Sequence, residues 1–148
     1  MRMNLEGLLA LGRIRNVEKT QFDPALAERD LTAAQNSLSS GDCDWALSIA
    51  YNSALQAGRG LMFHMGFRPA GTEAHKAVFE FLLAIGFEPE ITSYFDRMRR
   101  KRHIAVYDRV QTVSRSEAEE CIDQAILFVQ KIRTFVQKIR TVSEDAGT

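Results

Sequence analysis

The sequence predicts an all-α protein, an antiparallel bundle of four or five helices. Apolar residues recur at spacings of three and four along most of the chain, as they do on the buried face of an α-helix. Capping residues, glycines and prolines divide this pattern into helix-length segments joined by short connections, which favours antiparallel neighbours. No alternating run of β-branched residues is long enough to indicate a sheet.

The first bundle helix is predicted to begin at Asp23-Pro24, an N-cap followed by a first-turn proline. Its apolar stripe consists of Ala27, Leu31, Ala34 and Leu38, and the sequence Ser39-Ser40-Gly41 ends it. Before this helix, Leu5 to Val17 is predicted to be an extra short helix or an arm.

The second predicted helix is the central one. Asp42 can cap it, it runs to about Met65, and its apolar residues cover more than one face. Gly58 and Gly60 lie inside it, where each costs about 1 kcal/mol relative to alanine. We therefore expect a neighbouring helix to approach closely there. Gly66-Phe67-Arg68-Pro69 then breaks the chain.

Three further helices follow. The third is capped by Thr72 and closes at Gly86 and Pro89, and its buried residues are Val78, Phe81, Leu82 and Ile85. The fourth runs from about Glu90 to Tyr107. The fifth begins with a capping box of Ser116 and Glu119, and its apolar stripe consists of Ala118, Ile122, Ala125, Val129, Ile132, Val136 and Ile139. The predicted organisation is an arm or short helix over residues 1–22, a bundle domain over 23–142 and a frayed polar tail over 143–148.

One heptad is repeated without change: FVQKIRT occurs at Phe128–Thr134 and again at Phe135–Thr141. Seven residues rotate an α-helix by only about −20°, so the extra heptad keeps the apolar stripe on the same side and adds about 10 Å of helix. The repeat is either a neutral duplication that the helix tolerates or an extension that packs on a second subunit.

Composition excludes several classes of protein. The 19 basic and 19 acidic residues balance, so any attraction to nucleic acid must be local. The two cysteines, Cys43 and Cys121, form no CxxC pair, and we expect both to be reduced and packed. The sequence has no signal-peptide pattern and no run near the ~20 apolar residues that span a membrane. We expect a soluble, cytoplasmic protein.

Positive charge is concentrated in the segment DRMRRKRHIAVYDR, residues 96–109, where five cations fall within seven positions. On a helix, Ile91, Tyr94, Phe95, Met98 and Ala105 share the core side, and Arg102 points into the same sector. An arginine directed at an apolar face needs a carboxylate, a carbonyl or an anionic ligand. The other cations are expected at the edges and outside, where they are candidate contacts to a nucleic acid or nucleotide: Arg97, Arg99, Arg100, Lys101 and, beyond them, Arg109.

Two groups in this segment are capable of proton chemistry. His103 has nearby cations that should keep its imidazole neutral and able to accept a proton, and Tyr107 lies four residues further on in the row Arg99, His103, Tyr107. His64 and His75 form no HxxxH or HExxH pair, and no cysteine stands at metal-ligand spacing from either. We therefore predict neither a metal site nor a cofactor, and any chemistry would come from helix side chains.

Three stretches together resemble the HEPN domain, a five-helix, all-α family found in prokaryotic toxin and defence systems and in some eukaryotic proteins. They are the long second helix, ALSIAYNSALQAGRGLMFHMGFRP, followed by HKAVFEFL; the segment RRKRHIAVYD; and the start of the last helix, SEAEECIDQAILFVQKI. The resemblance covers about residues 23 to 140. It implies a homodimer whose two copies face each other across a cleft, and, by analogy with the family, a cognate nucleotidyltransferase as a partner.

Active members of that family carry an arginine followed four to six residues later by a histidine, and they cleave RNA without metal. Arg102 and the polar His103 match the first part of this motif, whereas Tyr107 stands at the position of the histidine. The resemblance thus implies catalytic roles for Arg102, His103 and Tyr107. A second alignment, Arg97 with His103, satisfies the spacing but moves the motif away from the inward-facing arginine.

Three functions are compatible with these features. The first is a homodimer that binds RNA or a nucleotide through the arginine-rich motif, as part of a toxin–antitoxin or defence system. The second is an active metal-independent endoribonuclease toxin, with Arg102 stabilising charge on phosphorus and His103 as base. The third is a non-catalytic dimerisation or interaction module whose basic segment is only a solvated face.

Overall fold

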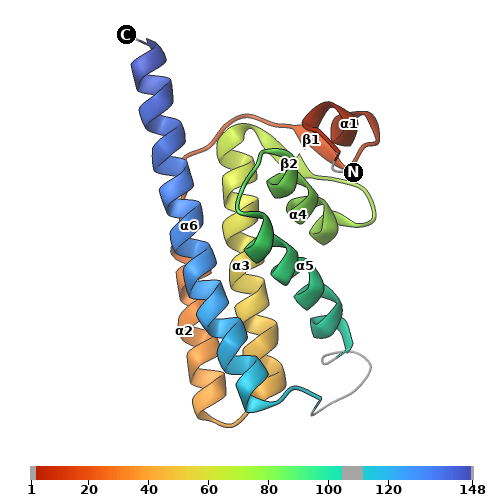
Figure 1. Ribbon diagram of the computed structural model, residues 1–148, viewed down its shortest axis with the longest axis vertical. Helices are drawn as coiled ribbons and strands as arrows, with labels where there is room; N and C mark the ends of the chain where they lie inside the picture. The colour runs from red at the N-terminus through yellow and green to blue at the C-terminus, as the bar shows by residue number, and fades with distance from the viewer. Residues whose placement is uncertain (1–2, 105–111, 148) are drawn as a thin grey trace.

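The computed structural model of the chain describes residues 3–104 and 112–147. Helices dominate this part of the chain, as predicted, and a small antiparallel ribbon accompanies them (Figure 1). The helices are α1 (Leu5–Ala10), α2 (Ala25–Ser39), α3 (Cys43–Met65), α4 (Ala74–Ala84), α5 (Pro89–His103) and α6 (Arg115–Gly147), and the strands are β1 (Ile14–Asn16) and β2 (Phe67–Pro69). Helix α6 includes residues 143–147, which the sequence assigned to a tail.

Helix α3 is the centre of the bundle, as its apolar residues on several faces predicted. It contacts α2 and α6 on one side and α4 and α5 on the other (Figure 1). Small side chains, Ala46, Ala50, Ala54 and Ala57, are buried along it and let these neighbours approach. Helices α2, α3 and α6 thus form one layer of the bundle, and the α4–α5 pair packs on the other side of α3.

Gly58 marks the predicted close approach of a second helix. A Cβ atom at Gly58 would lie 2.8 Å from Cγ1 of Val78 in α4, too close for any side chain there unless Val78 or α4 moves. Gly60 has a different neighbour, because a Cβ there would lie 3.1 Å from the ring of Phe22, which precedes α2. The prediction is therefore confirmed for Gly58, whereas at Gly60 the neighbour is not a helix.

The predicted helix ends are correct for α3. The Asp42 side chain accepts a hydrogen bond from the backbone N–H of Trp45 at 3.3 Å, and Gly66 ends the helix in the left-handed conformation with φ 91°. The start of α2 lies one position later than predicted, since Pro24 occupies the N-cap position while Asp23 accepts from the N–H of Ala25 at 2.9 Å.

Two other predicted caps are wrong by one or two residues. Helix α4 has Glu73, not Thr72, at its N-cap, with no side-chain cap, because the Glu73 carboxylate is engaged by Arg13. The capping box of α6 consists of Ser114 and Glu117, two residues before the predicted pair: Ser114 Oγ accepts from the Glu117 N–H, and the Glu117 carboxylate accepts from the Ser114 N–H, both at 3.1 Å.

The N-terminal arm, residues 3–22, combines the short helix α1 with the strand β1. Strand β1 pairs antiparallel with β2, with Ile14 opposite Pro69 and Asn16 opposite Phe67. The sequence did not reveal these strands, because three residues are too few to establish an alternating pattern. The arm is thereby attached to the α3–α4 connection.

Both copies of the repeated heptad contact the same aromatic ring. Phe87, in the α4–α5 connection, meets Phe128 edge-on at a centroid distance of 5.5 Å and Phe135 edge-on at 5.6 Å. Phe128 is fully buried and Phe135 is half-buried. The second copy therefore still packs on the bundle at its start, and α6 then extends past the ends of the other helices (Figure 1). A contact with a second subunit stays a prediction.

Candidate functional site

Helix α5 distributes the basic segment over different faces. Ile91 and Phe95 are buried and Tyr94 and Met98 pack against the core, which confirms the predicted core side for these four residues. Ala105, Tyr107 and Arg109 lie outside the described residues. Of the described cations, Arg97 and Arg100 are exposed, whereas Arg99, Lys101 and Arg102 are half-buried.

Arg102 turns inward, as helical geometry predicted. Its Nε donates a hydrogen bond to Oγ of the buried Ser48 at 3.2 Å, and its guanidinium carbon lies 5.6 Å from the centroid of the Tyr51 ring. Both contacts come from α3, so the central helix orients this arginine. A hydrogen bond combined with a cation–π contact restricts the guanidinium to one orientation before any ligand binds.

The other described cations of α5 divide into two that line the pocket described below, Arg99 and Arg100, and two that do not, Lys101 and Arg97. Lys101 pairs with Glu117 of α6 at 3.2 Å, and Arg97 lies over the Tyr94 ring at 5.9 Å from its centroid. The backbone N–H of Ser114 and then Lys101 lower the pKa of the Glu117 carboxyl. Neither Lys101 nor Arg97 lines the pocket described below, so the alternative alignment of Arg97 with His103 does not bring these two residues together there.

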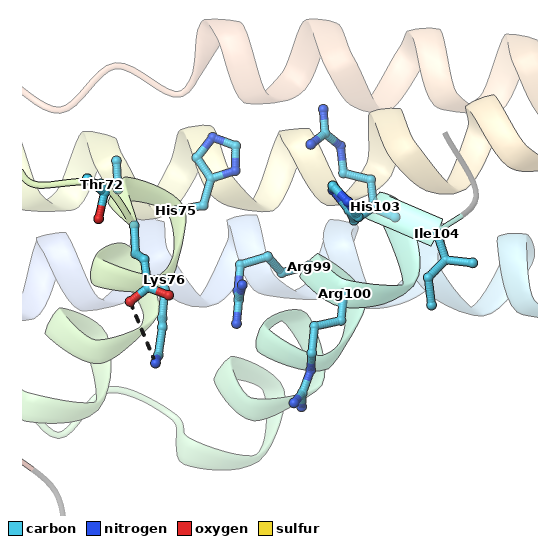
Figure 2. Close-up of a pocket in the computed structure, with 10 residues that line it drawn as sticks. Thr72, His75, Lys76, Arg99, Arg100, His103 and Ile104 are labelled. Carbon is cyan, nitrogen blue, oxygen red and sulfur yellow. Dashed lines mark ion pairs between the residues drawn. The ribbon is translucent and has the colours of Figure 1, made fainter. Parts of the chain in front are cut away.

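A pocket of about 650 Å³ lies between the start of α4 and the end of α5. We call it the α4–α5 pocket; it is lined by Thr72, Glu73, Ala74, His75, Lys76, Arg99, Arg100, Arg102, His103 and Ile104. Figure 2 shows side chains from both helices around it. Four of these lining residues carry permanent positive charge and one carries a carboxylate, so the potential in the pocket favours anions.

His75 is one of the site residues that sequence reasoning missed, together with Glu73 and Lys76 of the same turn. It lies on the first turn of α4, its ring centroid is 6.2 Å from that of Tyr51, and Figure 2 shows it on the opposite side of the pocket from His103. Burial lowers the pKa of His75, and Arg102, Arg59 and Arg99 lower it further. The imidazole therefore resists protonation more than a free one does. The one feature of the sequence that could have indicated a role for His75 in the site is its position at the start of the HKAVFEFL stretch.

The lowered pKa of His75 predicts a pH dependence of folding stability. Because the unfolded imidazole protonates near pH 6.5 while the folded one resists protonation, the unfolded state binds more protons as the pH falls below about 6.5. The free energy of unfolding should therefore decrease from pH 7 downward until the folded pKa is passed. In a His75→Asn variant, urea titrations at several pH values should show a weaker decrease over that window, and an unchanged decrease would contradict the assignment.

The cysteines take no part in this pocket. Cys121 is buried with its Sγ 3.8 Å from the carbonyl oxygen of Leu47, and burial raises its pKa to about 12. Cys43 is half-buried, and both cysteines are free thiols. Cys121 is packed as predicted and is not a reactive thiol at neutral pH.

The described ranges, 3–104 and 112–147, hold neither a metal-binding cluster nor a membrane-spanning helix. Within them, no three residues among His, Cys, Asp and Glu converge in a way that could hold a metal ion. No helix in the same ranges combines the length and apolar character that crossing a bilayer requires.

Comparison with known proteins identifies the family. The HEPN domain model matches residues 25–138. Solved structures with the same fold include ST0689, an archaeal HEPN homologue, at 21% identity and a TM-score of 0.59, covering 76% of this chain and 93% of that one. Another is TT1696 from Thermus thermophilus, at 24% identity and a TM-score of 0.58, covering 75% of this chain and 93% of that one. No curated protein matches. The chain belongs to the HEPN domain family.

Proposed function

We propose that this HEPN protein binds a phosphate group of RNA or of a nucleotide in the α4–α5 pocket. The observation that carries the proposal is the convergence of Arg99, Arg100 and Arg102 from α5 with Lys76 from α4 on one concave surface. Guanidinium groups match the geometry of phosphate oxygens, and a concave surface of one charge sign concentrates their field. The pocket volume of about 650 Å³ lies within the range of small-molecule sites.

The proposal includes a homodimer and a place in a toxin–antitoxin or defence system. HEPN domains often dimerise, and in active members two copies contribute to one cleft. Two α4–α5 pockets side by side would form a longer cationic surface suited to single-stranded RNA. A cognate nucleotidyltransferase rests on analogy with the family alone.

Salt dependence of binding tests the proposal. A fluorescent single-stranded RNA should bind with an affinity that falls about 20-fold between 50 and 200 mM salt if about three phosphates are contacted, since each contact contributes a slope of about −0.7 for single strands. Nucleotide monophosphates serve as competitors that distinguish RNA from a mononucleotide ligand. An RNA affinity that does not change with salt would contradict the proposal and favour a protein-interaction module.

A metal-independent endoribonuclease is the second candidate, because two imidazoles, those of His75 and His103, line the pocket. In such a reaction the ribose 2′-hydroxyl gives its proton to a neutral imidazole and attacks the adjacent phosphorus. The bond to the 5′-oxygen breaks, that oxygen takes up a proton, and an arginine stabilises the charge on phosphorus. Incubation with RNA in EDTA should then yield 2′,3′-cyclic phosphate ends. If no such ends form at high protein concentration, the endoribonuclease is excluded and the first candidate, RNA binding without cleavage, is retained.

A further inference from the structure

Glu73 contributes a carboxylate to the otherwise cationic lining of the α4–α5 pocket. Glu73 lies at the N-cap position of α4, and its side chain is 53% exposed. Its Oε2 lies 3.3 Å from Nη2 of Arg13 and 3.9 Å from Nζ of Lys76. A carboxylate in this place competes with a phosphate for the lining cations, so the partner that holds Glu73 affects what the pocket can bind.

Arg13 is that partner, and it comes from the N-terminal arm, outside the residues that match the family model. Its Nε donates to Oε1 of Glu80 at 2.7 Å, and its Nη2 contacts both Glu80 and Glu73. Glu73 and Glu80 are seven residues apart and lie on one face of α4, so a single guanidinium bridges them. With 23% of the Arg13 side chain and 27% of the Glu80 side chain exposed, this contact is partly shielded from water.

Backbone hydrogen bonds hold Arg13 in place. The carbonyl oxygen of Arg13 accepts from the N–H of Ala70 at 2.9 Å, and Arg15 in β1 pairs with Arg68 in β2. Further along the arm, the N–H of Val17 donates to the carbonyl oxygen of Gly66 at 2.9 Å. The arm therefore presents the Arg13 guanidinium to α4 from a fixed direction.

We propose that Arg13 is a positioning residue of the α4–α5 pocket, which holds the Glu73 carboxylate away from the lining arginines and so favours phosphate binding there. This inference rests on the proposed function for its ligand. With Arg13 in place, the Glu73 carboxylate already lies 3.9 Å from Nζ of Lys76. Without Arg13, we expect this carboxylate to pair more closely with the lining cations, Lys76 first, and to neutralise part of their charge. The N-terminal arm thereby contributes to the site although it lies outside the pocket.

Three variants test this role with single-stranded RNA as the probe at low salt. Arg13→Gln should lower the affinity about three- to tenfold, the effect of one partly screened ion pair. The double variant R13Q/E73Q should recover at least the wild-type affinity, because the competing carboxylate is gone. R13Q/E80Q should stay as weak as R13Q, since Glu80 does not line the pocket. An R13Q/E73Q protein as weak as R13Q would overturn the inference and leave Arg13 a purely structural role.

Arg15→Gln is the matched control for the loss of one arm charge. Arg15 is exposed in β1 and does not line the pocket, so its replacement should change the RNA affinity by less than about twofold. Urea denaturation of all variants should show that R13Q remains folded under the binding conditions. A loss of affinity in R15Q equal to that in R13Q would mean that only overall charge matters, and this outcome would also overturn the inference.

A readout that needs no ligand separates this inference from the proposed function. His75 is faced by Tyr51 and Arg59 from α3 and by Arg99 and Arg102 from α5, and it follows Glu73 on the same turn. If Glu73 moves into the pocket in R13Q, the His75 pKa measured by NMR titration should rise, and it should return in R13Q/E73Q. That pattern without RNA binding by the wild type would refute the proposed function alone. RNA binding with an unchanged His75 pKa and affinity in R13Q would refute the role of Arg13 alone.

Discussion

Replacement of Arg102 with alanine should lower the affinity for single-stranded RNA or a nucleotide by about 10- to 100-fold. Arg102 lines the α4–α5 pocket and is oriented by Ser48 and by the Tyr51 ring, so it can meet a phosphate without first losing conformational freedom. Hydrogen bonds to charged groups contribute about 1.5–3 kcal/mol, which corresponds to this range of affinity. Fluorescence anisotropy at low salt would measure the change, and the salt slope should decrease as well.

Arg97→Ala is the matched control, because it removes the same charge from the same helix. The Arg97 side chain is exposed over the Tyr94 ring and does not line the pocket, so we expect a loss of affinity of less than about threefold. Arg102→Lys is informative beside it, since lysine keeps the charge but cannot make the planar contact with phosphate. If Arg102→Ala reduced the free energy of unfolding by more than it reduced the free energy of RNA binding, the basic segment would have a structural role. The third function, an interaction module, would then be favoured.

Replacement of Phe128 with alanine should destabilise the bundle by about 3–5 kcal/mol. Phe128 is fully buried and meets Phe87 edge-on at 5.5 Å and Phe95 at 5.2 Å, so its removal leaves a cavity where α5, α6 and the α4–α5 connection join. A loss of this size is a large fraction of the stability of a typical domain. Urea denaturation followed by circular dichroism would measure it as a lower transition midpoint.

Phe135→Ala provides the comparison within the repeated heptad. Phe135 begins the same seven-residue sequence as Phe128 but is half-buried, and its ring packs edge-on against that of Phe87. We therefore expect a smaller loss of about 1–2 kcal/mol. Equal losses for the two variants would contradict this difference in burial. A midpoint for Phe135→Ala that depends on protein concentration, when that of Phe128→Ala does not, would support the second-subunit role of the repeat.

Helix positions and the core could be read from sequence because local rules govern both. The periodic apolar residues of the central helix predicted α3, and Asp42 and Gly66 set its ends through hydrogen bonds within a few residues of themselves. The inward direction of Arg102 followed from the 100° turn per residue of α5. The caps of α4 and α6 were displaced by one or two residues because several neighbouring polar residues could serve equally well in the sequence.

The composition of the pocket could not be read in the same way. His75 and Lys76 are far from the basic segment in sequence and reach it only because α4 and α5 pack side by side. The short strands β1 and β2 carry no periodic signal, yet their pairing places Arg13 beside Glu73 and Glu80. Each of these contacts depends on the path of the chain through space rather than on local spacing.

By itself, the sequence determined the helical class, the central helix and the inward-facing arginine of a HEPN domain, since apolar periodicity and capping act within one or two turns. Only the tertiary structure decided which side chains share a pocket. His75 of α4 lines the same pocket as Arg99 and Arg102 of α5, whereas Arg97 and Lys101 lie outside it. The physical reason is that a binding site requires groups on different helices to converge. Their convergence depends on how α3 positions both helices, with α4 approaching closely at Gly58, and not on the residues of either helix alone.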